Sequence, residues 1–530
     1  MSHRKLLTLA LTTAGVLAMT AINTPASVAE DTGATETTQA SSADQYENSV
    51  VTIVVQLTDD APALADMKER VNAAVAAAVP GASATGLREY THALHGFAIK
   101  APASSLAAIR ATPGVKAAFV DRHSATIYNV YQPNSSDDED QGKDNDPSHS
   151  TAMDMTAAAQ ATHRGSGQVI EIIDTGFDTS HSAFAGSVEG TRLSQADVTS
   201  LAATLGDGRG GGWVSAKIPF AYDYADGDAD VTYPAPGEFP DQTDDARYTH
   251  GTHVAALAAA NGSEFRGAAP DAQLIMAKVL GNDDQDINDS VLLAALDDAA
   301  VLTPDVLVVS VGDDSGQNGD ALAVYADVYA ALTAKGVAIN APAGDYTSSA
   351  WGNWNSDNLP FATDADFGAI IWPALDSNAL ATASLDEVEK RDGEPLPGAT
   401  PSLFSSWGVT PDLRLKPEIA APGGDVMSAL PAGTYGRRAG TAEASAQVAG
   451  IAALVRQRIA ADPMFAGMSA ADKDAVVANF LMGTAHPVVD ATQTDGTFYS
   501  PRQVGSGLVD AVGATTSPVY PSVVGAANPS

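Results

Sequence analysis

Short apolar segments alternate with helical patterns in the second half of the chain, and this alternation constrains the fold more than any other feature. The helical patterns cover 289–302 and 321–335, and the predicted strands cover 168–173, 274–280, 306–311 and 337–341. Alternation of this kind predicts a doubly wound, mostly parallel sheet with helices on both faces. In such sheets, functional side chains gather at the carboxyl ends of the strands.

A second, smaller pattern occupies 50–123. Predicted strands at 51–57, 95–100 and 115–120 are interleaved with predicted helices at 61–79 and 103–112. Pro80-Gly81 and Pro113-Gly114 end the two helical stretches. Strands and helices interleaved over so short a stretch predict a small α+β sandwich.

The remaining segments frame these two folded parts. Arg4 and Lys5 precede an apolar run at 6–19, which is too short to span a membrane and is typical of a signal peptide. The chain of 530 residues is therefore divided into a signal peptide at 1–29, a disordered stretch at 30–49, the small domain at 50–123, an acidic linker at 124–150, the large domain at 151–520 and a tail at 521–530. Secretion, free or at the cell surface, is the expected location.

Composition excludes several function classes. The formal net charge of −37 would repel nucleic acids and anionic membrane surfaces, so neither is expected as a partner. The chain has no cysteine, which excludes disulfides, thiolate metal sites and cysteine nucleophiles.

Asp174 and His250 are the first candidates for chemistry. Asp174 ends a predicted strand, and His250 and His253 open a helical run. Taken singly, an Asp here would be a turn or cap residue, and the two histidines could bind a metal, although no further ligand stands nearby. An Asp followed by a His and then by a glycine-led helix near the carboxyl end is one chain order of a Ser-His-Asp apparatus.

These motifs resemble the subtilisin-like serine protease family, the subtilases. The resemblance rests on IDTG at 173–176, HGTHVA at 250–255, and stretches similar to the lactocepin and C5a-peptidase branch at 217–231, 404–424 and 505–510. It implies a subtilisin-like fold over about 160–520, with Asp174 and His250 as catalytic residues. Ser310, Val311 and Gly312 resemble the strand that pairs with a polypeptide substrate. HALHGFAIK at 92–100 and PGVKAAFVD at 113–121 resemble the family's inhibitory, ferredoxin-like propeptide.

Residues 440–450 depart from the family pattern. They read Gly-Thr-Ala-Glu-Ala-Ser-Ala-Gln-Val-Ala-Gly where the family has Gly-Thr-Ser-Met-Ala-Ser-Pro-His-Val-Ala-Gly. Ala442 falls on the nucleophile, and a methyl group cannot attack a carbonyl. Asp345 falls on the asparagine that donates to the oxyanion, although some active subtilases carry Asp here. Thr441 falls on a residue that supports the oxyanion.

Three hypotheses follow from these residues. The favoured one is a pseudoprotease that keeps a peptide-binding cleft and lacks turnover. The alternative is an active serine endopeptidase, either through Ser445 or because the chain is a mutated form of a working enzyme. Ser445 lies about 5 Å further along the expected helix, which is outside the reach of a histidine placed for position 442.

The third hypothesis is that the propeptide-like domain stays attached unless another protease cuts the acidic linker, because the residue that would cut it away is missing. The chain's own propeptide is then a permanent partner of the cleft. No cofactor is expected. A calcium ion at the Asp-rich stretch 223–230 is an open alternative, but a solvated acidic loop is the simpler interpretation.

Overall fold

The computed structural model describes residues 49–121, 123–124, 146–235, 245–284, 286–312, 319–346, 370–386, 399–410, 412–490, 493 and 495–521. These residues belong to one compact unit that extends over Tyr46–Ser530. The predicted signal peptide and most of the predicted acidic linker lie outside the described residues.

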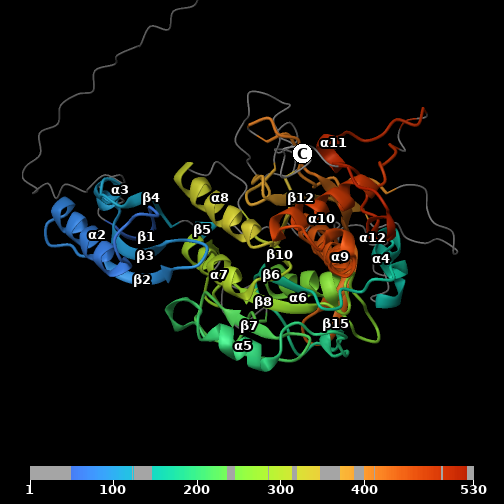
Figure 1. The fold of residues 1–530 in the computed structure, drawn as a ribbon, viewed down its shortest axis with the longest axis horizontal. Coiled ribbons are helices and arrows are strands. Elements are labelled where there is room, and N and C mark those ends of the chain that lie inside the picture. The colour runs from blue at the N-terminus through green and yellow to red at the C-terminus, as the bar shows by residue number, and fades with distance from the viewer. Residues whose placement is uncertain are drawn as a thin grey trace, which may run out of the picture. The chain divides into compact units, whose positions relative to one another are not determined.

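The small domain is a four-stranded antiparallel sheet with two helices (Figure 1). Its elements are β1 (Val50–Leu57), α2 (Leu64–Ala78), β2 (Thr85–Tyr90), β3 (Gly96–Pro102), η1 (Ala103–Ser105), α3 (Leu106–Arg110) and β4 (Val115–Val120). The strand order β2-β3-β1-β4 is that of a ferredoxin-like sandwich, as predicted. Strand β2 was not predicted, because its sequence TGLREY contains a glycine, two charged residues and few β-branched ones.

The two faces of β1 point into different cores. Ile53 and Val55 pack with Met67 and other residues of α2, while Val54 belongs to a core that extends into the large domain. Because successive side chains on a strand point to opposite faces, the β-branched sequence VVTIVVQL buries both sides at once. The small sheet therefore lies between its own helices and the large domain.

The large domain is built on a seven-stranded parallel sheet, which confirms the predicted fold class. In sheet order its strands are β13 (Ile419–Gly424), β12 (Ala379–Asp386), β11 (Ala338–Pro342), β10 (Val306–Val309), β6 (Val169–Asp174), β8 (Gln273–Lys278) and β7 (Phe220–Asp223). Strands β7, β12 and β13 were not predicted. They are short or rich in alanine, glycine and proline, which have weak strand propensity.

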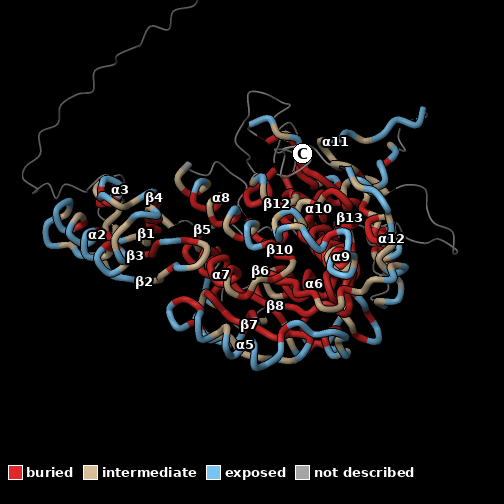
Figure 2. The backbone as a smooth tube through the Cα atoms, viewed as in Figure 1, coloured by how far each residue is buried: buried red, intermediate tan, exposed pale blue. Residues whose placement is uncertain are grey.

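Helices cover both faces of this sheet. Helices α6 (Asp245–Ala259) and α9 (Thr441–Ala461) share one core with Ile170 and Ile172 of β6. Helices α7 (Asp289–Leu302) and α8 (Gly319–Ala334) share the other core with Val169 and Ile173. Figure 2 shows the central strands and α6 as buried tube.

The remaining elements surround this framework. They are β5 (His123–Ser124), η2 (Pro147–His149), α4 (Ala152–Met155), η3 (Ala158–Gln160), η4 (Ser182–Phe184), α5 (Gln195–Ala202), η5 (Gly206–Gly208), β9 (Ile287–Asn288), β14 (Val426–Leu430), β15 (Thr434–Arg438), η6 (Pro463–Phe465), α10 (Ala470–Thr484), α11 (Pro501–Val504) and α12 (Ala511–Thr516). Among the described helices, none is long and apolar enough to cross a membrane.

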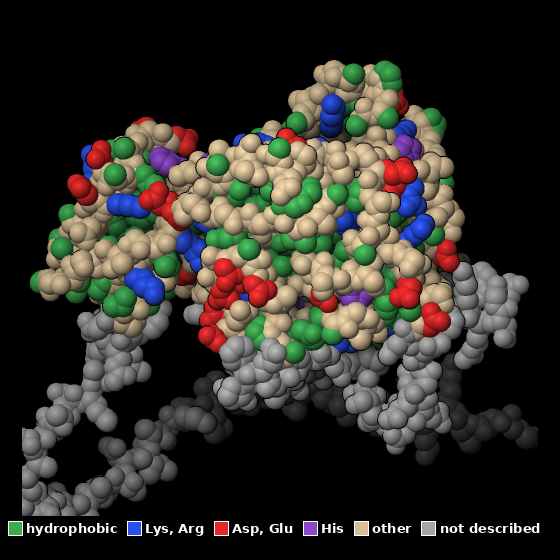
Figure 3. All heavy atoms as spheres, turned by 90° about the horizontal axis from the view of Figure 1, so that it is seen from below, with side chains coloured by type: hydrophobic (Ala, Val, Ile, Leu, Met, Phe, Trp, Pro, Cys, Tyr) green, Lys and Arg blue, Asp and Glu red, His purple; other side chains and the backbone are tan. Residues whose placement is uncertain are grey.

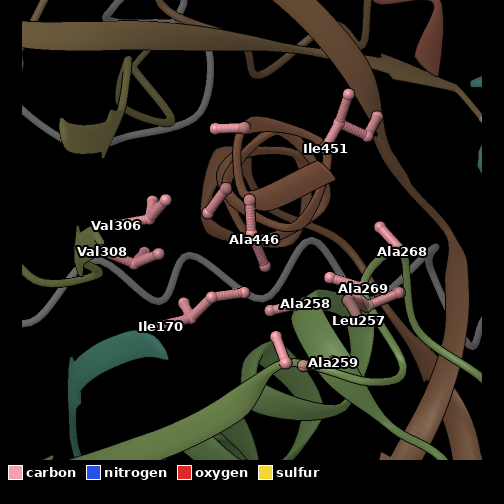
Figure 4. Close-up of a cluster of buried hydrophobic side chains, with 14 of the residues drawn as sticks. Ile170, Leu257, Ala258, Ala259, Ala268, Ala269, Val306, Val308, Ala446 and Ile451 are labelled. Carbon is pink, nitrogen blue, oxygen red and sulfur yellow. The ribbon is translucent and has the colours of Figure 1, made fainter. Parts of the chain in front are cut away.

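Helix α9 passes through the core next to the sheet. Ala446 lies in the same apolar cluster as Ile170 and Val308 of the sheet and Ala258 of α6 (Figure 4). Small side chains on α6 and α9 allow the two helices to approach closely, so the amino terminus of α9 is held firmly against the sheet.

The small domain docks on α7 and α8 through hydrogen bonds and ion pairs. The Asp297 carboxylate of α7 accepts bonds from the backbone N–H groups of four successive residues, 91–94, at 2.7–3.0 Å. Arg110 pairs with Asp320 at 2.6 Å, and Lys116 pairs with Asp327 at 2.5 Å. The acidic surface of these helices thus matches basic residues of the small domain.

Candidate active site

Asp174 and His250 come together at the carboxyl end of β6. His250 Nδ1 lies 2.8 Å from Asp174 Oδ1, and both side chains are buried. Thr175 orients the carboxylate, because its backbone N–H donates to the same oxygen at 2.6 Å. The structure therefore contains the His–carboxylate pair that chain order and the family resemblance predicted.

Gly251 explains why glycine follows His250. A Cβ atom on residue 251 would lie 2.2 Å from the Gly176 carbonyl oxygen and 3.1 Å from Asp174 Oδ1. Only glycine allows α6 to pass so close to the loop after β6, and this close passage brings His250 to Asp174.

Carboxylates determine the charge of His250. Burial opposes charge on the imidazole, but the Asp174 carboxylate outweighs burial, and together with Glu443 and Asp345 it raises the pKa of His250 to about 9. His250 is consequently an imidazolium at neutral pH. A general base must be unprotonated to accept a proton, so His250 is poorly suited to that role at pH 7.

Ala442 is the second residue of α9 and is buried at the helix amino terminus. Its neighbour Thr441 is bonded to Asp345 twice, with the backbone N–H donating at 2.9 Å and Oγ1 donating at 2.8 Å to Asp345 Oδ1. Thr441 Oγ1 also accepts from Gly344 N–H at 3.0 Å. Asp345 thus caps α9 and fixes the position of Ala442.

Asp345 holds its proton more tightly than an ordinary aspartate. Burial raises its pKa to about 7, against the hydrogen bonds from Thr441, which lower it. Near neutral pH the carboxyl group is therefore partly protonated. Only the protonated form can donate a hydrogen bond as the amide of an asparagine would.

Glu443 forms a contact that sequence reasoning missed. Its Oε1 lies 3.3 Å from His253 Nδ1, and His253 Nε2 lies 3.1 Å from the Val426 carbonyl oxygen. Burial raises the pKa of Glu443, but its contact with His253 and the nearby charge of His250 together outweigh burial and lower that pKa. In the sequence, the one indication of this contact is His253, the second histidine of HGTHVA, whose spacing from His250 also fits a metal ligand.

Comparisons with known proteins agree with this geometry. Residues 165–507 match the model of the subtilase family. The chain belongs to this family. Residues 30–126 match the peptidase inhibitor I9 model, so the small domain is a subtilase propeptide domain. This match begins inside the stretch that was expected to be disordered, and most of that stretch lies outside the described residues.

Known subtilases are similar over parts of the chain. This chain is 28% identical over 276 residues to the PI-type proteinase of Lactococcus lactis subsp. cremoris. The aligned stretch covers 49% of this chain and 13% of that protein. The chain is 34% identical over 123 residues to the C5a peptidase of Streptococcus pyogenes, covering 23% of this chain and 10% of that protein. The chain thus spans a small part of the length of these relatives.

A solved structure confirms the fold. Fervidolysin from Fervidobacterium pennivorans, described as a keratinolytic enzyme related to subtilisin, superposes with a TM-score of 0.57 at 16% identity. The match covers 89% of this chain and 62% of fervidolysin. At this identity the likeness shows a shared fold and nothing about activity.

Ser445, the alternative nucleophile in this subtilase chain, is completely buried. Its Oγ has no hydrogen-bond partner among the described residues. Gln447, at the position of the family's second histidine, donates from Nε2 to the Pro422 carbonyl oxygen at 2.5 Å. Neither side chain is bonded to His250 in the part of the chain that the structure describes.

Ser310, Val311 and Gly312 continue from β10 beside the Asp174 strand. Ser310 N–H donates to the Ile173 carbonyl oxygen at 3.1 Å, and all three residues are buried. This position at the carboxyl edge of the sheet fits the predicted substrate strand. Pairing with a substrate stays a prediction.

The Asp-rich loop 223–230 contacts an internal cation. The buried Lys278 ammonium pairs with Asp223 and with Asp226. Among the described residues, one group of three side chains with metal-ligand chemistry comes together, His92, Asp297 and Asp298. Its carboxylates already accept bonds from the backbone of 91–94 and from Arg209, so we propose no metal for it.

Proposed function

We propose that this subtilase is a pseudoprotease that binds polypeptides without hydrolysing them. The observation that carries the proposal is Ala442 at the amino terminus of α9, at the position where the sequence pattern places the nucleophile. Asp174 and His250 remain bonded to each other, so the partners of the nucleophile are retained while the nucleophile is replaced by a methyl group.

Two neighbouring substitutions support the same proposal. Glu443 adds a carboxylate beside the site, and Asp345 replaces a neutral donor by an acid. Both act in one direction, because both favour the protonated form of His250. Restoring a hydroxyl at 442 would therefore leave it without an efficient base at neutral pH.

Burial counts against Ser445 as a substitute. Its Oγ is fully enclosed within α9 packing, so a substrate carbonyl would have to enter the core to reach it. A misplacement of about 1 Å already costs a reacting pair roughly a hundredfold in rate, and Ser445 is displaced by about one helical turn.

The propeptide domain is proposed to stay in place. In an active subtilase the catalytic serine releases the propeptide, and Ala442 cannot do so. Hydrogen bonds from 91–94 to Asp297 and the pairing of β5 with β9 would then persist. Finding a mature amino terminus near residue 148, after expression in a protease-free host, would contradict this part.

The proposed location is extracellular, free or at the cell surface. The support is the charged and apolar pattern of residues 1–29, which has the features of a signal peptide.

The decisive test compares the purified chain with subtilisin on an unfolded protein substrate. We expect no cleavage above background, since loss of the serine in a subtilisin costs roughly 10⁶-fold in turnover. A serine-directed fluorophosphonate probe should leave the chain unlabelled. Cleavage that disappears in Asp174→Ala, or a label on Ser445, would overturn the proposal and favour the active endopeptidase.

A further inference from the structure

A small cavity lies near the amino ends of β11 and β12, away from the carboxyl ends of the strands where the candidate active site lies. It has a volume of about 30 Å³ and is enclosed by these two strands together with α9 and α10. Its walls are mainly apolar, and its polar lining residues are Asn340, Asn378 and Asp474. A water molecule needs roughly 10–15 Å³ of such space, so the cavity has room for water and for little else.

Strand geometry turns the side chain of Asn340 toward this cavity. Ile339 packs in the core that β11 shares with α7 and α8, while Ala338 packs in the core that includes α9 and α10. Because successive side chains on a strand point to opposite faces, Asn340 faces the same side as Ala338. An amide group thus stands where the neighbouring side chains are apolar.

The amide of Asn340 lacks the partner that its position requires. Asn340 is 2% exposed, and its Nδ2 has no hydrogen-bond partner among the described residues. A buried amide donor that stays unpaired is destabilising, and native proteins pair almost all such groups with protein atoms or with ordered water. The environment of Asn340 therefore calls for an acceptor inside the cavity.

Asp474 lines the same cavity from α10. Its side chain is 15% exposed, and within the described part of the chain it accepts one bond, from Arg456 Nη2 at 3.4 Å, which is longer than an ordinary hydrogen bond. Arg456 Nη2 also donates to the Gly336 carbonyl oxygen at 2.5 Å. Burial raises the pKa of Asp474 to about 6, against the charge of Arg456, which lowers it.

This setting differs from that of most acids in the chain. On the face drawn in Figure 3, acidic side chains gather at the surface, where solvent hydrates them. Asp474 is largely withdrawn from solvent, and a buried carboxylate needs further hydrogen-bond donors. The cavity is the space beside Asp474 from which such a donor can reach it.

We infer that the cavity is a binding site for an ordered water molecule that accepts a hydrogen bond from the Asn340 amide and donates one to the Asp474 carboxylate. A cation would leave the Asn340 donor unpaired, and an anion would be repelled by Asp474. Water supplies both an acceptor and a donor. Asn378 gives it a third partner, because Nδ2 of Asn378 donates to Asp376 Oδ1 at 3.0 Å and its Oδ1 remains to accept.

Such a water connects the sheet to α10 at a place where no direct hydrogen bond joins them through these described side chains. It lies apart from the cleft, since Ala452 of its lining follows Ala442 by ten residues of α9, or about 15 Å. Asn340 is then a positioning residue of the fold. The inference is independent of the proposed lack of turnover.

A crystal structure of the full chain, at a resolution that shows ordered solvent, tests the site directly. We expect density for a water within about 3.2 Å of both the Asn340 amide and the Asp474 carboxylate. Asn340→Leu keeps the shape of the side chain and removes its polar atoms, so this water should be lost from the variant. An empty cavity in the parent chain, or a direct bond between Asn340 and Asp474, would overturn the inference.

A double-mutant cycle measures whether the two residues act through a shared partner. In urea unfolding, Asn340→Leu and Asp474→Ala should each lower the folding equilibrium constant about tenfold. Together they should lower it at least about fivefold less than the product of the single effects, because the same water is lost only once. Near-ultraviolet circular dichroism checks that each variant is folded.

Asn479→Leu provides the matched control. Asn479 is also buried on α10 with an unpaired amide atom, its Oδ1, but it lies outside the lining of the cavity. Its effect should multiply with that of Asn340→Leu to within about twofold. Independent effects of Asn340→Leu and Asp474→Ala, or equal coupling in both cycles, would contradict a shared water. The parent crystal structure decides the question even where a variant fails to fold.

Discussion

Buried acids have different surroundings in two regions of the molecule. One region is the face of α7 and α8 that contacts the propeptide domain, and the other is the amino terminus of α9. On the docking face, Asp297 is saturated by four backbone N–H groups, and Asp298 pairs with Arg209 through two bonds. At α9, Glu443 and Asp345 lie close together beside His250, whose pKa is raised, and Glu443 also contacts His253, whose pKa is lowered by burial.

The two arrangements of carboxylates have different chemical consequences. A buried carboxylate surrounded by donors holds two parts of the molecule together. Carboxylates grouped around an imidazole keep it protonated, which opposes its use as a base. The structure thus holds the propeptide domain through a saturated carboxylate, while the carboxylates at the amino terminus of α9 raise the pKa of His250.

The largest effect is expected from restoring a hydroxyl at position 442, which tests the difference between the two regions directly. We expect Ala442→Ser to remain about a hundredfold slower at pH 7 than at pH 9 and above, because His250 has a pKa of about 9. Adding Glu443→Met should move the pH profile of kcat/KM to lower pH. An unshifted profile would contradict the role given to Glu443.

Removing the Asp297 carboxylate tests the docking face. Asp297→Ala leaves four N–H groups without their acceptor, at a cost on the order of 3–5 kcal/mol. Amide hydrogen exchange at 91–94 should speed up by at least about 100-fold. Exchange as slow as in the parent chain would show that other contacts carry the docking.

Asp345→Asn should stabilise the protein in a pH-dependent way. Folding raises the pKa of Asp345 from 3.8 to about 7, so the folded chain binds a proton that the unfolded chain releases between these values. Stability therefore falls as pH rises through this window. The variant should gain about 2–4 kcal/mol at pH 8 and nothing below pH 4 in urea unfolding. An equal gain at both pH values would contradict the assignment.

The exposed ion pairs of the docking face should matter least. Arg110→Ala or Lys116→Ala removes a pair whose side chains are 41–48% exposed, so each should change stability by less than about 1 kcal/mol. An effect as large as that of Asp297→Ala would mean that these pairs, and not the buried carboxylate, dominate docking.

The sequence by itself determined the class of fold and the main positions of the site. Periodicity placed α7 at its observed bounds and predicted the four strands β6, β8, β10 and β11, because buried parallel strands are continuous apolar runs. Chain order and the family motifs linked Asp174 to His250, and the structure joins them across β6 and α6. A methyl group at position 442 is a fact of sequence alone.

Only the tertiary structure decided which charges face one another. Glu443 and His253 are 190 positions apart and meet because α6 and α9 pack together in one core. Asp297 meets residues 91–94 because the small sheet lies against α7. Burial sets the pKa of Asp345, and burial depends on neighbours that the local sequence does not contain.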